Sequence, residues 1–395
     1  MTPPTKRLSQ PEFIALIAMN FAMVAFSIDS MLPALPEIAE ALTPDAPNRA
    51  QLVLTSFVFG MGVGTLFTGP LSDTFGRKTV IGAGALLYLI GAALAGRAET
   101  LEGMLAGRVL QGLGVAGPRV VAIAIVRDLY EGRPMARIMS YAMMVFTLVP
   151  ALAPLLGSFI IDAFGWRAVF YSFLLFCCLV IGWLMIRQPE TLPPERRRSF
   201  APAALIEATR VCFSHRVFVL STAMQVLAFG MLFGCLSSVQ QIFETSFGRA
   251  ETFELWFALI ALISGSASVI NAQLVVRLGM QRMITIGFGM QVAFSAMVLL
   301  LALFGAVPFG LYIVWTTSLF FMAGLVIGNL NALAMEPVGD IAGLAASVLG
   351  AVATVLGAMI AAPIGLAFDG TPLPLAMATA TLSAIGLFTV FRGLR

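Results

Sequence analysis

Twelve long apolar segments, joined by short polar connections, constrain this chain more than any other feature. About 20 apolar residues in a helix span the roughly 30 Å hydrocarbon core of a bilayer. Only helices and closed barrels satisfy their backbone polar groups there. The pattern therefore predicts an all-α polytopic membrane protein with twelve transmembrane helices. The segments run approximately over residues 13–35, 51–71, 79–95, 102–126, 136–161, 166–186, 217–243, 253–276, 283–304, 309–335, 343–368 and 373–391.

Composition supports the membrane assignment and excludes several function classes. The residues are 59% hydrophobic and 11% charged, whereas soluble domains carry about 25% charged residues. The net charge of only +3 predicts no nucleic-acid partner. The four cysteines show no disulfide or zinc-ligand spacing, and no phosphate-binding loop is present. We expect no metal and no cofactor, with the proton as coupling ion.

The longest polar connection predicts two halves. It lies between the sixth and seventh segments and contains the run PPERRR at residues 193–198. We predict a six-helix bundle at 1–187, a cytoplasmic linker at 188–216 and a second six-helix bundle at 217–395. The runs APLLG at 153–157 and APIG at 362–365 suggest one ancestral unit used twice. Such pseudo-symmetric repeats place a substrate site at their interface near the bilayer midplane.

The distribution of positive charge predicts the orientation. Of the 23 Lys and Arg residues, Arg108 and Arg119 fall within spans. Four more lie on one side of the predicted membrane, and the remainder lie on the side of the two termini. Cytoplasmic loops carry the excess of Lys and Arg, so both termini are predicted to be cytoplasmic. The four on the opposite side are Arg49, Arg97, Arg167 and Arg249.

One acid and one arginine are expected at similar depth in the membrane. Asp29 lies 16 residues after Phe13, and Arg108 lies seven residues after Leu101. On a helix these separations are about 24 Å and about 10 Å, and the two spans run in opposite directions. A charge at membrane depth costs roughly 2.5–3.5 kcal/mol on insertion scales. Because burial favours the neutral acid and a guanidinium favours the carboxylate, we predict proton coupling at this pair. A static ion pair is the alternative.

Arg119 is a second cation within the fourth segment. It lies eleven residues after Arg108, three helical turns plus about 20°, so both point in one direction. Two cations on one stripe can hold an anionic or carbonyl-bearing substrate. The alternative is that Arg119 satisfies backbone carbonyls that Pro118 leaves free.

Further candidates for the substrate cavity are aromatic, amide and thioether side chains, which offer an adaptable surface. Phe26 lies one turn before Asp29, so we expect it to line the same cavity. Helix packing and contact with lipid are the alternatives. The candidates are Phe26, Gln111, Arg119, Tyr141, Met144, Gln225, Phe229, Phe233 and Gln240. Prolines inside the segments predict helix bends, and these are Pro118, Pro150, Pro154 and Pro363.

Three runs resemble signatures of the major facilitator superfamily. Residues 69–78, GPLSDTFGRK, which we interpret as a polar loop, resemble the family's G-x-L-a-D-r-x-G-r-k motif. Residues 108–114, RVLQGLG, resemble its R-x-x-Q-G-x-G signature. Residues 29–36, DSMLPALP, resemble the end of the first span in Bcr/CflA-type drug:proton antiporters, with Met31 in place of tyrosine. The fifth span departs from the antiporter pattern, because Val, Ala and Ser replace three glycines.

The resemblance implies two bundles that open alternately to each side of the membrane. It also implies a conformational latch formed by Asp73, Gly76, Arg77 and Asp128. In this latch the sharp turn needs Gly76, Arg77 reaches Asp128, and Asp73 accepts from a helix N-terminus. The alternative is that these charges only determine topology.

We therefore predict a secondary active transporter, not an enzyme, in a bacterial-type inner membrane. It would export amphipathic small molecules or drugs in exchange for protons and function as a monomer. A dedicated metabolite exporter and a proton symporter are neighbouring alternatives. An intramembrane enzyme or a receptor is an alternative of a different class. No predicted span carries a catalytic motif that would support an enzyme. The sequence also shows no soluble sensory domain that would support a receptor.

Overall fold

A computed structural model gives the fold of the chain at residues 8–197, 202–305 and 307–393. Within these ranges the chain forms helices and contains no strand. The long helices are α1 (Gln10–Asp29), α3 (Leu52–Phe75), α4 (Arg77–Gly96), α5 (Leu101–Leu129), α6 (Gly132–Phe164), α7 (Arg167–Arg187), α9 (Arg216–Gln241), α10 (Phe253–Leu278), α11 (Met280–Leu303), α12 (Phe309–Met335), α13 (Ala342–Leu366) and α14 (Leu373–Gly393). The shorter elements used below are η1 (Leu32–Ala34), α2 (Leu35–Leu42), η2 (Pro47–Gln51), η3 (Pro194–Arg196), α8 (Pro202–Ser214) and η6 (Glu336–Ile341).

Eleven continuous helical segments of the described chain are long and apolar enough to cross a membrane. One of them, Phe309–Leu366, has 58 residues, which as a single helix would extend about 87 Å. That is nearly three times the hydrocarbon core. Val338 interrupts it with φ −129° and ψ 30°, between α12 and α13. These two helices therefore cross separately, and the prediction of twelve spans is confirmed.

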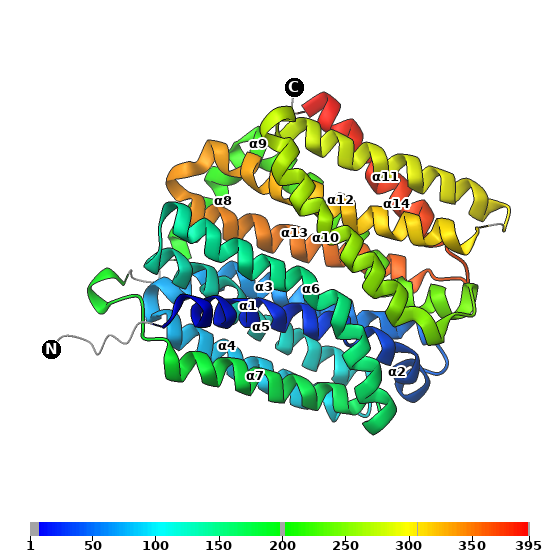
Figure 1. The fold of residues 1–395 in the computed structure, drawn as a ribbon, viewed down its shortest axis with the longest axis horizontal. Coiled ribbons are helices and arrows are strands. Elements are labelled where there is room, and N and C mark those ends of the chain that lie inside the picture. Colours follow the sequence, from blue (N-terminus) through cyan, green and yellow to red (C-terminus); the bar gives the residue numbers. More distant parts are fainter. Residues whose placement is uncertain (1–7, 198–201, 306, 394–395) are drawn as a thin grey trace.

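The helices form two groups that meet along two seams. Helices α1–α7 occupy the lower part of Figure 1 and α9–α14 the upper part. The groups contact each other where α3 packs on α13 and where α6 packs on α10. We call the end of the molecule that holds Gly76 and the start of the 188–216 connection the linker end, and the opposite end the α2 end. The boundaries at 187 and 217 remain our proposal for the domain division.

Glycines bring α5 into close contact with two neighbouring helices. On the α3 side, a Cβ added to Gly64 would lie 2.7 Å from the Leu113 carbonyl oxygen. On the α4 side, a Cβ added to Gly84 would lie 2.7 Å from the Gly114 carbonyl oxygen. Small residues of this kind allow backbones to approach closely within membranes. Helices α3, α4 and α5 therefore form a tightly packed layer.

The prolines predicted to bend helices all lie inside helices: Pro118 in α5, Pro150 and Pro154 in α6, and Pro363 in α13. Pro118 cannot donate to the carbonyl of Gly114, four residues earlier. That oxygen is the one that Gly84 approaches. The close approach of α4 therefore covers the polar group that Pro118 leaves free.

Two predicted boundaries are wrong in informative ways. The run 69–78 is not a loop, because α3 continues to Phe75 and α4 begins at Arg77. Only Gly76 separates the two helices, with a positive φ of 96° that other residues rarely adopt. The first span also ends earlier than expected, since α1 stops at Asp29 and the proline-containing η1 and α2 follow.

We expect Gly112→Ala to destabilise the layer of α3, α4 and α5. A Cβ at this position would overlap the Phe57 carbonyl oxygen and crowd the Met61 amide. Overpacking of this kind costs about 1–3 kcal/mol. Thermal unfolding of the purified protein in detergent measures the loss.

Gly182→Ala is the matched control, because nothing lies within 4 Å of an added Cβ there. Equal melting temperatures for the two variants would contradict the packing argument.

Candidate functional site

Arg108 is a completely buried hub (0% exposed) that joins three helices. Its Nε donates to the Val53 carbonyl oxygen at 3.1 Å, and its Nη2 donates to the Ser27 carbonyl oxygen at 3.0 Å. Its Nη1 donates to Gln111 Oε1 at 2.8 Å, and the guanidinium lies 4.4 Å from the Phe57 ring centroid. Ser27 belongs to the last turn of α1, whose carbonyls lack intrahelical donors. Arg108 therefore places positive charge at the negative end of α1.

A hydroxyl pair next to this hub links α1 to α4. Ser27 Oγ donates to the Met23 carbonyl oxygen at 2.6 Å, and it also lies 2.6 Å from Tyr88 Oη. Since the Ser27 proton is already used, the Tyr88 hydroxyl is the donor in the second bond. The end of α1 is thus held from both α4 and α5.

Asp29 and Arg108 lie at similar depth, as expected from residue counting, and proton coupling at this pair stays a prediction. Arg108 bonds to the backbone of Ser27, two residues before Asp29, and forms no ion pair with the carboxylate. Asp29 is 5% exposed and makes no hydrogen bond or ion pair with any described residue. The alternative of a static ion pair is therefore wrong. The structure therefore contains a buried carboxylate at the end of a helix whose position Arg108 fixes.

Arg119 lies on α5 eleven residues after Arg108, closer to the linker end. Its Nη1 donates to Met61 Sδ at 3.4 Å, and among the described residues it makes no other hydrogen bond. The alternative that Arg119 satisfies carbonyls near Pro118 is therefore wrong. Arg108 uses its donors inside the fold, with Gln111 among the acceptors, and joint contact of Arg108 and Arg119 with one substrate stays a prediction.

The structure does not bring the remaining cavity candidates into one site. Phe26 packs on Phe173 and Phe176 of α7, with ring centroids 5.5 and 5.3 Å away, so it faces away from the seams. On α6, Tyr141 and Met144 are 40% and 62% exposed. Neither lies in an enclosed site.

The candidates on α9 are spread along the helix. Phe229 and Phe233 stack with centroids 5.2 Å apart, and Phe229 packs against Gly357 of α13. Gln225 and Gln240 are both buried, and each has an amide oxygen without a hydrogen bond. They are fifteen residues apart, or about 22 Å along the helix, so one small ligand cannot contact both.

The residues of the predicted latch form a charged cluster at the linker end. Arg77 Nε and Nη2 donate to the Asp128 carboxylate at 2.9 and 3.3 Å. Its Nη1 donates to Asp73 Oδ1 at 2.5 Å and to Ser72 Oγ at 2.8 Å. Arg77 therefore ties α3, α4 and α5 together. All of these residues belong to the first helix group, so opening the seams does not by itself break the cluster.

Glu190, which the sequence analysis did not identify, caps α4. Its carboxylate accepts from the backbone amides of Arg77 and Lys78, each at 3.0 Å. It also accepts from the amides of Thr191 and Leu192, each at 3.0 Å. A carboxylate at a helix N-terminus is stabilised by the free amides and the helix dipole. Glu190 thus takes the role that we had predicted for Asp73.

The connection between the two helix groups is docked at both ends. Thr191 Oγ1 donates to Asp128 Oδ2 at 2.9 Å, which adds to the contacts of Glu190 with the first group. Further along, Cys212 of α8 is buried in a cluster with Phe218 of α9 and Val348 of α13. We call residues 188–197 and 202–214 the strap, because they contact both groups.

Polar contacts also join the two groups at the α2 end. Asn48 Nδ2 donates to the carbonyl oxygens of Leu366 and Phe368 at 3.1 and 2.6 Å, and Ser158 Oγ donates to Glu254 Oε1. Leu366 is the last residue of α13, so Asn48 of η2 satisfies a free carbonyl of a helix in the other group. This end of the α3–α13 seam is closed.

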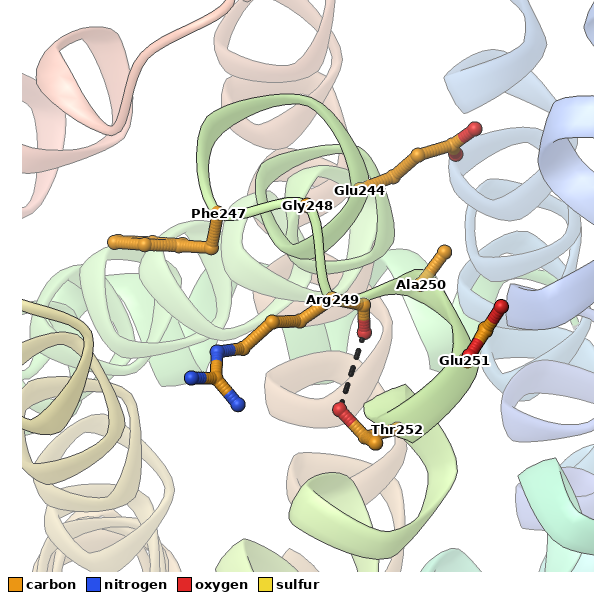
Figure 2. A pocket seen from close by; sticks show the side chains of 7 residues that line it. All are labelled: Glu244, Phe247, Gly248, Arg249, Ala250, Glu251 and Thr252. Atoms are coloured by element: carbon orange, nitrogen blue, oxygen red, sulfur yellow. Dashed lines mark hydrogen bonds between the residues drawn. The ribbon is translucent and has the colours of Figure 1, made fainter.

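Two hollows of the described structure each lie within one helix group. Figure 2 shows a hollow of about 550 Å³ in the turn between α9 and α10, where Glu244, Arg249 and Glu251 point in different directions. Arg249 lies over the Phe309 ring at 4.5 Å. The second hollow, of about 460 Å³, is an apolar groove between α1, α6 and α7 that includes Phe26. Neither contains Asp29 or Arg119.

Glu190 and Asn48 were missed because nothing near them in the sequence marks a site. Both lie in polar connections next to proline, as ordinary turn residues do. A possible signal was that α4 begins with Arg77 and Lys78, whose basic side chains cannot cap their own helix N-terminus. A capping acid had to come from elsewhere.

Known proteins resemble this chain along most of its length. The family model of the Major Facilitator Superfamily matches residues 16–363. The chain is 28% identical over 351 residues to a bicyclomycin resistance protein homolog of Haemophilus influenzae, covering 88% of this chain and 87% of that protein. It is 30% identical over 337 residues to the multidrug resistance protein MdtL of Escherichia coli, covering 84% and 83%. The fold matches a partially occluded inward-open structure of the xylose transporter XylE from E. coli, with TM-score 0.74, 13% identity and 98% coverage of each chain.

We expect Glu190→Gln to loosen the docking of the strap on α4. The amide keeps the shape of the side chain but loses the charge, which is worth about 1–2 kcal/mol at a partly buried helix N-terminus. Hydrogen exchange at the amides of Arg77, Lys78, Thr191 and Leu192 should accelerate roughly fivefold to thirtyfold.

Glu195→Gln is the control, because Glu195 is exposed and lies in η3 of the same strap. Unchanged protection at all four amides in Glu190→Gln would refute the capping role.

Proposed function

This chain belongs to the Major Facilitator Superfamily, and on that premise we propose that it exports amphipathic small molecules or drugs in exchange for protons. The names of the bicyclomycin and multidrug resistance relatives support drugs as the substrate class. The fold and the relatives are those of transporters, and the chain crosses the membrane many times. We further propose that it works as a monomer in the bacterial inner membrane.

The proposed orientation places the linker end in the cytoplasm. The strap and the ends of α1, α7, α9 and α14 lie at this end, where Arg187 pairs with Glu12 and Arg216 bonds to the Arg392 carbonyl. The excess of Lys and Arg at this end supports the assignment. In this orientation the seam closed by Asn48 faces the outside.

The observation that carries the proposal is the unpaired carboxylate of Asp29. An ionised acid without a partner is costly in a membrane interior, and a proton is the simplest partner that removes the charge. The carboxylate therefore has a physical reason to bind a proton when its surroundings are dry and to release it when they are wet. Because Arg108 bonds to α1 and not to Asp29, it leaves the acid free to change state.

Alternating access requires that the two ends open at different times. The α2 end is closed by Asn48 and by the Ser158–Glu254 contact. At the linker end, the strap contacts both groups and limits how far they can separate. We propose that the Asn48 contacts break when the transporter opens to the outside, while the Arg77 cluster moves as part of the first group.

We expect Asp29→Asn to abolish efflux driven by a pH gradient, because the amide cannot carry a proton. Exchange of substrate down its own gradient should persist, since the amide resembles the protonated acid. Purified protein in proteoliposomes, loaded with a fluorescent drug under an imposed pH gradient, measures both activities.

Asp162→Asn is the control, because it removes an exposed acid at the α2 end of α6. Full accumulation of the drug by Asp29→Asn under a pH gradient would contradict the proposal that Asp29 carries the proton. Accumulation of drug in the direction of the proton flow by the unmodified protein would indicate symport instead.

We expect Asn48→Ala to favour the state that is open at the α2 end. Two cross-group hydrogen bonds are lost, at about 1 kcal/mol each, so the open population should rise roughly fivefold to thirtyfold. In a chain without native cysteines, Gln51→Cys reports the opening, because Gln51 is buried (1% exposed) beside Gly365 of α13. The rate of labelling by a membrane-impermeant maleimide measures it.

Arg49→Ala is the matched control, since Arg49 pairs with Glu102 inside the first group. Equal labelling rates for Asn48→Ala and Arg49→Ala would contradict the role of Asn48 as an outer gate.

A further inference from the structure

Arg119 is a cation without a suitable acceptor in a membrane-spanning helix. A guanidinium has five N–H donors and never loses its charge. The structure satisfies one of them, and only with the sulfur of Met61 at 3.4 Å, which is a weak acceptor. Arg108, on the same helix, shows the contrast, because its donors reach two carbonyl oxygens and an amide oxygen. A charge within a membrane-spanning helix that the protein leaves unpaired is costly and needs a partner from outside the fold.

The acids of the fold do not supply that partner. Asp128, nine residues further along α5, is bonded to Arg77. Asp29 lies at the level of Arg108, which is about 16 Å along α5 from Arg119. No ion pair of Arg119 with a carboxylate occurs among the described residues. The guanidinium is therefore available to a ligand.

The position of Arg119 suits a ligand that must contact both helix groups. Long side chains on a helix point toward its N-terminus, so Arg119 points toward the middle of the membrane, where it meets Met61 of α3. The next residue on α3, Gly62, packs against α13, and a Cβ there would lie 2.8 Å from Val355 Cγ2. Arg119 thus contacts α3 one residue from the position at which α3 touches α13.

We propose that Arg119 binds the anionic group of the transported molecule, a carboxylate, sulfonate or phosphate on an apolar scaffold. This inference rests on the proposed export function and adds the charge of the substrate. The planar fork of a guanidinium matches such oxyanions with two parallel hydrogen bonds. Met61 beside it supplies a polarisable, adaptable surface for the apolar part of the ligand.

The test compares one scaffold with and without its charge. Dansylglycine is an acid at neutral pH, and dansylglycinamide is its uncharged counterpart. The purified protein in detergent should bind the acid at least tenfold more tightly than the amide, measured by dansyl fluorescence. Arg119→Gln should remove this preference by weakening binding of the acid alone, and Arg119→Lys should retain part of it, since Lys keeps the charge without the fork.

Arg49→Gln is the matched control, because it removes an arginine that pairs with Glu102 at the α2 end, away from Arg119. It should keep the preference for the acid. Gel-filtration profiles that match the unmodified protein exclude misfolding as the cause of any loss. Equal affinity of the unmodified protein for the acid and the amide, or a preference that survives in Arg119→Gln, would overturn the inference.

Efflux assays in proteoliposomes separate this inference from the function on which it rests. Arg119-dependent binding of dansylglycine without any efflux would contradict the export function and support the anion site. Efflux of both probes at equal rates, unchanged in Arg119→Gln, would support export and refute the anion site.

Discussion

The bonds of Arg108 to the end of α1 are the interaction on which the arrangement of this protein depends. A helix that stops inside a membrane leaves carbonyl oxygens without donors, and no water is present to satisfy them. Arg108 supplies donors to Ser27 of α1 and Val53 of α3 from its place on α5. This allows α1 to end at Asp29 and the chain to turn through η1 into α2. Without that turn, Asp29 would lie in the middle of a continuous helix and could not occupy a helix end.

The features that depend on hydrophobicity were predictable from the sequence. Twelve spans follow from segment length. The alternative of a static ion pair between Asp29 and Arg108 is wrong because counting residues along a helix gives depth and does not give direction around the axis. It also ignores backbone carbonyls, which are the acceptors that Arg108 uses. The strap contacts of Glu190 were not predictable, since its partners lie more than 100 residues earlier in the chain.

The two ends of the molecule are controlled by different kinds of contact. At the α2 end, single hydrogen bonds join the two helix groups directly, through Asn48 and through Ser158. At the linker end, a dense charged cluster stays within the first group, and the strap connects it to the second. Weak direct contacts can break and re-form in each cycle, whereas a strap limits the amplitude of motion without having to detach. This asymmetry is consistent with a protein that must open to one side while it remains held together at the other.

The distance in sequence between Glu190 and the helix that it caps has a consequence for biosynthesis. Glu190 is made 113 residues after Arg77, which at 5–20 residues per second corresponds to roughly 6–23 s of translation. During that interval α4 is already in the membrane with its first amides uncapped, and the charged cluster lacks its acid from the strap. The first helix group therefore reaches its final form only after α7 has been inserted and the strap has left the ribosome. Folding of the first half is thus completed by a segment that also begins the connection to the second.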